Sequence, residues 1–130
     1  MENIQMIHVS SDVVDWTSQM NRVIMSSDNT HSKIRDIKFL FPVNNLIAHS
    51  ESGTFEHESD DLSLDNNVTA TKQDMIIKTD SIFWNSDQKT LHSDSHVLIT
   101  GDAYVINGEG LKIKDNGNLI VKNNVKALLY

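Results

Sequence analysis

The sequence predicts an all-β fold, a twisted antiparallel β-jellyroll built from about four strand-turn-strand repeats. Two observations predict it. Short apolar segments in which apolar and polar residues alternate recur along the chain, and this period of two is typical of strands with one buried face. One Pro and five Gly stand among many Ser, Asp, Asn, Val and Ile residues, a composition that favours short strands joined by polar turns. No segment sustains the apolar period of about 3.6 residues that a long helix requires.

An internal repeat places the elements. When the chain is aligned with itself, one apolar pattern recurs in four segments: 7–16, 48–57, 75–84 and 104–113. In the middle of each copy the apolar spacing changes from two residues to three, as from Thr79 to Ile82, so a regular pleat would turn its apolar face outward. We therefore expect a bulge or kink in each copy, which restores one inward face. These kinks fall at Asp12, Gly53, Asp80 and Glu109.

A polar turn and further strands follow each copy. The return strands contain Val23 and Met25, Leu62 and Leu64, Leu91, and Leu119 and Val121; third short strands contain Val68, Val97 and Ile99, and Val125 and Ala127. A repeat of this size cannot bury its apolar face alone, so the copies must stack on one another. We expect a single domain, 1–130, with an insertion at 29–45 after the first repeat.

The inward positions of the repeats form a row without charge, in which Trp16 and Trp84 occupy equivalent places. Such a row is either the closed core of a β-solenoid or a groove that binds an apolar ligand, and the pattern alone favours neither. The predicted groove residues are Val14, Trp16, Phe55, Ile77, Ile82, Trp84, Ile99, Ile106, Leu111 and Ile113. Val9 is expected to face inward with them.

Charge and motifs exclude several classes of function. The net charge of −7 and the pI near 5.2 argue against nucleic acid as a partner, since phosphate contact needs clustered Lys and Arg. No nucleophile motif, phosphate loop or zinc motif occurs, and the chain has no Cys. His92 and His96 are about 13 Å apart on a strand, too far to share a metal ion. We expect no enzyme activity, no metal and no cofactor.

Three segments resemble the OstA-like β-jellyroll family of bacterial lipopolysaccharide export, and the LptC type within it. They are LIAHSESGTFEHESDDLSLDNNV from Leu46, IIKTDSIFWNSDQKTLHSDSHVLIT from Ile76, and YVINGEGLKIKDNGNLIVKNNVKALLY from Tyr104. Each has the family cadence of an apolar strand, small or acidic residues, a middle hydrophobic pair, a turn and a return strand. The return strand ends in Val after Asn, as in DNNV and KNNV. The likeness covers about two thirds of the chain, and residues 7–25 read as a further, more diverged copy.

This resemblance implies a component of lipopolysaccharide transport in the periplasm rather than an enzyme. It implies that acyl chains of the lipid lie in the groove and pass to a partner jellyroll. The implied partners are lipopolysaccharide, an inner-membrane LptB/LptF/LptG-like transporter, and an LptA-like periplasmic bridge at the C-terminal edge. Open edge strands of consecutive jellyrolls would pair by β-augmentation. In this chain the edge residues are Ile7, Val9, Val125, Ala127 and Leu129.

Two features depart from the LptC pattern. Proteins of that type usually begin with a single membrane helix, and no such apolar segment precedes Ile7 in this chain. We therefore expect tethering to the inner membrane through an N-terminal helix that this chain does not contain. The alternatives are a soluble bridge protein of the LptA type, or a closed-core β-solenoid that acts as a scaffold or polymerises and takes no lipid. The insertion at 29–45 has no counterpart that we can match to the family.

Overall fold

The computed structural model describes residues 4–10, 13–42, 44 and 46–130. The regular secondary-structure elements within these residues are all β-strands. This result confirms the predicted fold class. The strands are β1 (Ile4–Ser10), β2 (Val13–Met20), β3 (Arg22–Met25), β4 (His31–Phe41), β5 (Leu46–Glu56), β6 (Leu62–Lys72), β7 (Met75–Asn85), β8 (Thr90–Thr100), β9 (Tyr104–Ile113), β10 (Leu119–Val121) and β11 (Lys126–Leu129).

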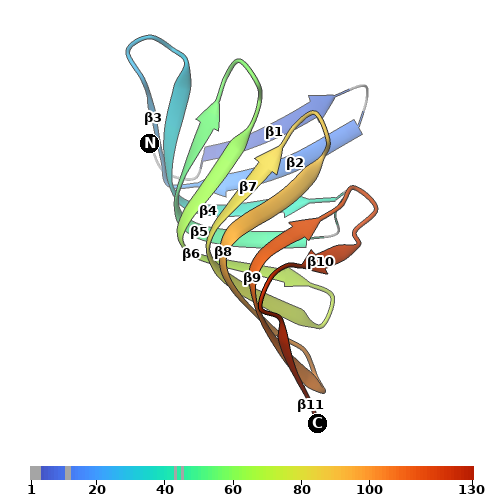
Figure 1. Cartoon of the computed structure of the whole chain (residues 1–130). Coiled ribbons are helices and arrows are strands. Elements are labelled where there is room, and N and C mark those ends of the chain that lie inside the picture. The colour runs from blue at the N-terminus through green and yellow to red at the C-terminus, as the bar shows by residue number, and fades with distance from the viewer. Residues whose placement is uncertain (1–3, 11–12, 43, 45) are drawn as a thin grey trace.

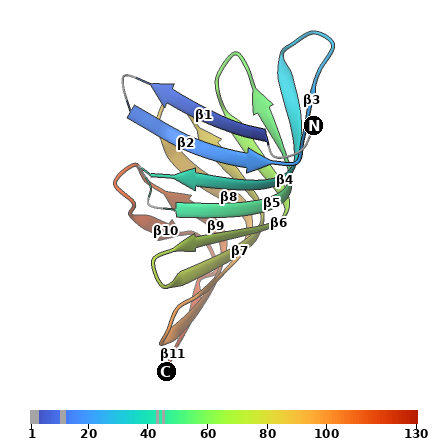
Figure 2. The same ribbon diagram turned by 180° about the vertical axis from the view of Figure 1, so that it is seen from behind.

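The described strands form one antiparallel sheet that follows the chain as a meander (Figure 1). Its order is β1-β2-β4-β5-β6-β7-β8-β9-β10, while β3 pairs with β4 and β11 pairs with β9. Figure 2 shows β1 and the C-terminal strands far apart at the two ends of the sheet, which does not close into a barrel. Consecutive strands are joined by short turns, as the Ser- and Asp-rich sequence predicts. In one of them, Asp28 accepts hydrogen bonds from Ser26 and Thr30.

Most long strands are bent near their middle. The pairing register shifts where β5, β6, β7, β8 and β9 meet their neighbours. Asn66, Asn67 and Gly110 have positive φ at these places, and Asp36 has positive φ at the bend of β4. Asn and Asp visit this left-handed region more readily than other residues with a side chain, and Gly does so at no steric cost. The bends of these strands therefore depend on having Asn, Asp or Gly at the positions with positive φ.

The predicted kinks agree with these bends in part. Asp80 lies within the register shift between Thr79 and Phe83, and Glu109 pairs with His96 at the edge of another shift. Gly53 lies beyond the shift between His49 and Ser52. Asp12 lies outside the described residues. The segments around Val68 and Val97, which we expected to be separate third strands, continue β6 and β8 beyond their bends.

The bends fold the single sheet into two layers, which diverge like an open V in Figure 1. The strand pairing shows which residues belong to each layer. Layer A contains β1, β2, 37–41, 46–50, 68–72, 75–79, 96–100, 104–108 and β11. Layer B contains β3, 31–35, 52–56, 62–65, 81–85, 90–93, 111–113 and β10.

The hydrophobic core fills the space between layers A and B. Along β4, β5 and β7 the buried residues alternate and then skip one extra position at the bend, as from Ile34 to Ile37 and from Thr79 to Ile82. Along β6 and β8 they skip two extra positions, as from Leu64 to Val68. The chain therefore presents apolar side chains to the same interior before and after each bend. The fully buried side chains include Trp16, Phe39, Phe41, Leu46, Leu62, Leu64, Ile77, Trp84, Leu91 and Ile99.

The first repeat copy was predicted wrongly. We expected 7–16 to be one kinked strand, but β1 and β2 are two strands that pair with each other, with Val9 opposite Val14. Both residues were expected inside, yet Val9 is 54% and Val14 39% exposed. The cause is that the chain reverses between β1 and β2, where we expected a kink within one strand. The pairing of the two strands then decides which residues face inward, and these residues are His8 and Trp16.

The expected insertion at 29–45 contains β4, which pairs with β2, β3 and β5 inside the sheet. Its alternating residues Ile37, Phe39 and Phe41 are buried in the common core. The alternation is visible in the sequence as IKFLF. We set the segment aside because it does not match the repeat pattern, but a strand needs only alternation to join a sheet.

We predict that Gly53→Ala lowers the free energy of unfolding by about 1–3 kcal/mol, the usual cost of overpacking a core. An added Cβ at this buried position would lie 2.7 Å from the Ser63 carbonyl oxygen and 3.0 Å from the Ile37 side chain. Urea denaturation measures the change. Glu51→Ala, at an exposed position of the same strand, is the control and should change stability by no more than about 0.5 kcal/mol.

Candidate functional site

The candidate site is the interior between layers A and B. The structure buries all but two of the predicted groove residues there: Trp16, Phe55, Ile77, Ile82, Trp84, Ile99, Leu111 and Ile113. Ile106 is half-buried and packs against this cluster. Val14 lies outside it on the exposed face of β2. The chain thus brings one apolar row together from both layers, and every repeat copy contributes to it.

Aromatic rings join the two layers. Trp16 of layer A meets Phe55 of layer B with ring centroids 5.9 Å apart, and Phe41 of layer A meets Trp84 of layer B at 6.3 Å. Phe39 completes the cluster, 5.1 Å from Trp16. Edge-to-face and tilted ring pairs of this kind stabilise a core beyond the area they bury. Sequence reasoning missed Phe39 and Phe41 because both lie in the segment taken as an insertion.

The interior is packed in this structure. Phe39, Phe41 and Ile77 have no exposed surface, and both tryptophans are 1% exposed. The hollows found among the described residues lie at the bends and turns and are lined mainly by polar side chains, such as His96 and Glu109. Neither tryptophan lines any of them. An apolar ligand therefore has to part the two layers before it can reach the row.

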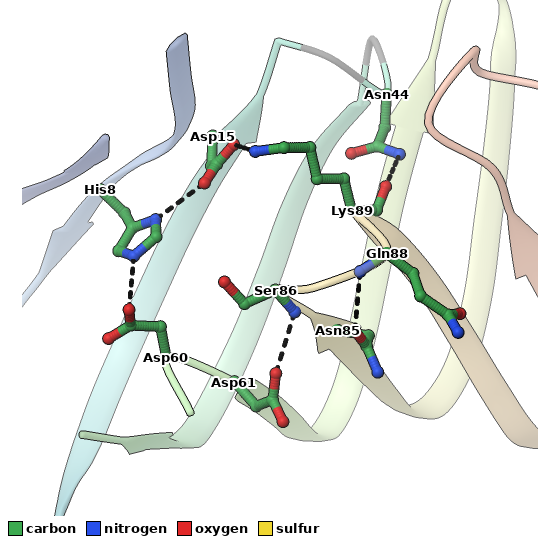
Figure 3. A network of polar contacts seen from close by, with 9 residues as sticks. All are labelled: His8, Asp15, Asn44, Asp60, Asp61, Asn85, Ser86, Gln88 and Lys89. Atoms are coloured by element: carbon green, nitrogen blue, oxygen red, sulfur yellow. Dashed lines mark hydrogen bonds and ion pairs between the residues drawn. The ribbon is translucent and has the colours of Figure 1, made fainter. Parts of the chain in front are cut away.

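Polar contacts close the open side of the V, opposite the bends (Figure 3). His8 of β1 lies between two carboxylates: its Nδ1 is 3.0 Å from Asp15 Oδ2, and its Nε2 is 3.3 Å from Asp60 Oδ2. The Lys89 ammonium donates to the other oxygen of Asp15. Asp60 belongs to the β5–β6 turn and Lys89 to the β7–β8 turn, both at the end of layer B. The contacts therefore connect β1 and β2 to the opposite layer.

Asn44, in the β4–β5 turn, makes a second connection between the layers. Its side-chain Nδ2 donates to the carbonyl oxygens of Lys89 and Lys114, at 3.1 and 2.8 Å. The residue is buried although it lies in a turn. Asp61 and Asn85 order the facing turns by accepting hydrogen bonds from the amides of Ser86 and Gln88. No motif could have revealed the contacts that join the two layers here, because the partners of the Asn44, Asp61–Ser86 and Asp15–Lys89 contacts are 25 to 74 residues apart.

The predicted edge residues lie at the two ends of layer A. Ile7 and Val9 are exposed on β1, the first strand of the sheet. Ala127 and Leu129 belong to β11, and Val125 immediately precedes it; all three are exposed. β11 pairs only with β9 among the described strands. Both ends thus present backbone that is available for strand pairing.

Comparison with known proteins identifies the family. The model of the family described as lipopolysaccharide-assembly, LptC-related, matches residues 4–130. The chain belongs to the LptC-related family. Proteins of this family are periplasmic components of lipopolysaccharide transport, so the family resemblance stated from the sequence is confirmed. The family acts in transport and is not known for enzyme activity. No curated protein matches the chain.

A solved structure gives the same fold. The chain is similar to LptH of Pseudomonas aeruginosa, described as the LptA-homologous periplasmic component of the conserved lipopolysaccharide transport device, with a TM-score of 0.67. The match covers 88% of this chain and 94% of that one, at 6% sequence identity. Identity this low supports the fold alone. It confirms the jellyroll architecture for this LptC-related chain.

Two further observations concern membranes and metals. Within the described part of the LptC-related chain, no helix has the length and apolarity needed to cross a bilayer. Among the same residues, no three His, Asp or Glu side chains gather closely enough to hold a metal ion. His92 and His96 are on β8 with their side chains on the surface of the sheet, and no such group includes them.

We predict that Asn44→Ala destabilises the protein by about 1–3 kcal/mol, the usual net contribution of two hydrogen bonds. The substitution deprives the Lys89 and Lys114 carbonyls of their shared donor. Thermal unfolding measured by circular dichroism tests it. Asn21→Ala removes one exposed amide contact to Asp36 and serves as the control, with a change below about 0.5 kcal/mol. Equal effects from both variants would contradict the structural role of Asn44.

Proposed function

We propose that this LptC-related chain carries lipopolysaccharide by sheltering its acyl chains between layers A and B, and that it catalyses no reaction. The observation that supports this most directly is the continuous apolar row, which runs from Trp16 through Trp84 to Ile113 and receives residues from both layers. Each buried CH₂ group of an acyl chain contributes about 0.8 kcal/mol, so even a partly inserted chain would be held.

The polar part of the lipid would stay in water. The chain has 18 acidic and 11 basic side chains, so its net charge repels phosphate groups at long range. Binding would then depend on the acyl chains alone and would be weak. Weak binding suits a carrier that must also release its load, with the direction of transport set by an ATP-driven extractor upstream.

The edges of layer A support the proposed partners. An exposed strand with free backbone groups can accept a strand from another protein, which extends the sheet across the interface. β11 would pair with an LptA-like bridge, and β1 would face an LptB/LptF/LptG-like transporter in the inner membrane. Tethering to that membrane would come from an N-terminal helix. The fold shared with LptH is consistent with a soluble bridge role as the alternative.

A closed scaffold without lipid is the second candidate function, and the packed interior favours it. In that case the aromatic cluster of Trp16, Phe39 and Phe55 is core alone, and the edges build filaments of successive copies. The two candidate functions differ in whether the interior contacts lipid.

The test is to place a photo-crosslinking amino acid at Trp84 or Ile106, in cells that depend on this protein, and to probe the adducts for lipopolysaccharide. We expect ultraviolet-dependent adducts from both inward positions. Lys78, exposed on the same strand as Trp84, is the matched control and should give none. Adducts should disappear when the upstream ATPase is inactivated. A folded protein that gives no adduct from either inward position would exclude the carrier function and leave the scaffold.

A further inference from the structure

The first two strands are attached to the rest of the sheet over a short length. We call residues 4–10 and 13–20 the β1–β2 ribbon. Only Thr17, Ser18 and Gln19 of the ribbon pair with β4 in the described residues. By contrast, β4 pairs with β5 along nearly its whole length. The half of the ribbon nearest its turn therefore projects beyond β4, and the short ladder at 17–19 can serve as its hinge.

Side chains, rather than strand pairing, hold the projecting half of the ribbon against layer B. His8 stacks on Trp16 within the ribbon, with ring centroids 5.6 Å apart, and meets the edge of Trp84 in layer B at 5.7 Å. Trp16 in turn packs on Phe55. At the rim, Asp15 and His8 bind Lys89 and Asp60 in the turns of layer B, as Figure 3 shows. These contacts form a seam between the ribbon and layer B.

The seam is the side on which the interior can open most easily. On the opposite side, every long strand runs continuously from one layer into the other through its bend, so the layers cannot separate there without breaking strands. In the middle of the open side, Asn44 ties the β4–β5 turn to two backbone carbonyls. At the ribbon, the Asp15–Lys89 and His8–Asp60 contacts and the aromatic contacts of His8 and Trp16 cross from one layer to the other.

The chemistry of the seam suits a reversible opening. The apolar contacts of Trp16 and Trp84 can be replaced by contacts with an acyl chain, so their loss is compensated when a ligand enters. The Asp15 carboxylate is buried when the seam is closed, with its side chain 1% exposed, and it regains water when the seam opens. Desolvation of this charge offsets part of the attraction to Lys89, which keeps the closed state from becoming permanent.

We propose that the β1–β2 ribbon is a lid over the interior, that a long acyl chain reaches the apolar row through the seam, and that the Asp15–Lys89 and His8–Asp60 pairs hold the lid shut. The identity of the ligand rests on the proposed function; the movement of the ribbon does not. The ribbon residues His8 and Trp16 would be the first groups of layer A that an entering chain meets.

The first experiment measures the lid without any lipid. Lys89→Gln keeps most of the side-chain length but removes the charge that binds Asp15. Hydrogen exchange followed by mass spectrometry should show amide exchange in 4–10 and 13–20 several-fold faster than in the unsubstituted protein, with β6 to β8 unchanged. Lys78→Gln, at an exposed position of layer A away from the hinge, is the matched control and should change neither region. Exchange that rises equally in all strands would mean general destabilisation and would overturn the lid.

The second experiment locks the lid. The chain has no Cys, so the double variant His8→Cys/Asp60→Cys introduces the only thiols, one on each side of the seam. Uptake of lipopolysaccharide labelled with a fluorophore on its sugar is followed before and after bridging with a short bis-maleimide. We expect uptake at least as fast as in the unsubstituted protein before bridging, and at least tenfold slower after it. The same double variant capped with N-ethylmaleimide controls for modification of the thiols.

The outcomes separate the two proposals. Equal uptake by the bridged and capped proteins would overturn the lid and leave the carrier function intact. If the unsubstituted protein takes up no labelled lipopolysaccharide, the carrier function fails, and the hydrogen-exchange experiment alone decides whether the ribbon opens. Slow uptake after bridging, together with fast exchange in Lys89→Gln, supports both.

Discussion

The fold depends on one constraint: each long strand must bend sharply halfway along and still present its apolar side chains to the inner face, so that a single sheet can cover itself. A regular pleat resists a sharp fold, whereas extra residues at a bulge let the strand bend and change which sequence positions face inward. The bends contain those extra residues. In β7, Thr79 and Ile82 face the same interior although they are three positions apart; in β6, Asn66 and Asn67 adopt left-handed backbone between the buried Leu64 and Val68, which are four positions apart. Both layers, the core and the open side follow from these bends.

This constraint also explains what could be predicted from the sequence. The change in spacing at Thr79 is a local signal, so the strands, the repeat and most of the buried row could be found without a structure. At the first copy the same signal was ambiguous, because a kink and a chain reversal leave the same apolar spacing. Phe39 and Phe41 were absent from the predicted row for a different reason, since they join the core by alternation alone and match no repeat. The contacts that Lys89 makes with Asp15 and Asn44 leave no local pattern, because each joins residues far apart in the sequence that only the folded sheet brings together.

Under the proposed carrier function, the packed interior would link stability with transport. The aromatic residues that would line a path for acyl chains are the same ones that hold layers A and B together, so ligand and protein would compete for one set of contacts. A carrier built in this way needs no empty cavity. It needs only that the contacts between the layers and the contacts with the ligand are close in free energy, since apolar contacts are largely non-directional and exchange readily. In the proposed lid, the polar contacts at the rim would determine how often that exchange begins.

The β1–β2 ribbon combines two roles that are separate in most sheets. β1 is the free edge of layer A, where a partner strand would pair, and it is also half of the proposed lid. A strand added to β1 would extend the ribbon's hydrogen bonding without touching the hinge at Thr17 to Gln19, because the added strand and β4 lie on opposite sides of the ribbon. Pairing at this edge would therefore change the twist and mobility of the ribbon itself. Contact with a neighbouring protein and opening of the interior are then mechanically connected through β1, whereas pairing at β11 acts on the far end of the layer and leaves the seam unchanged.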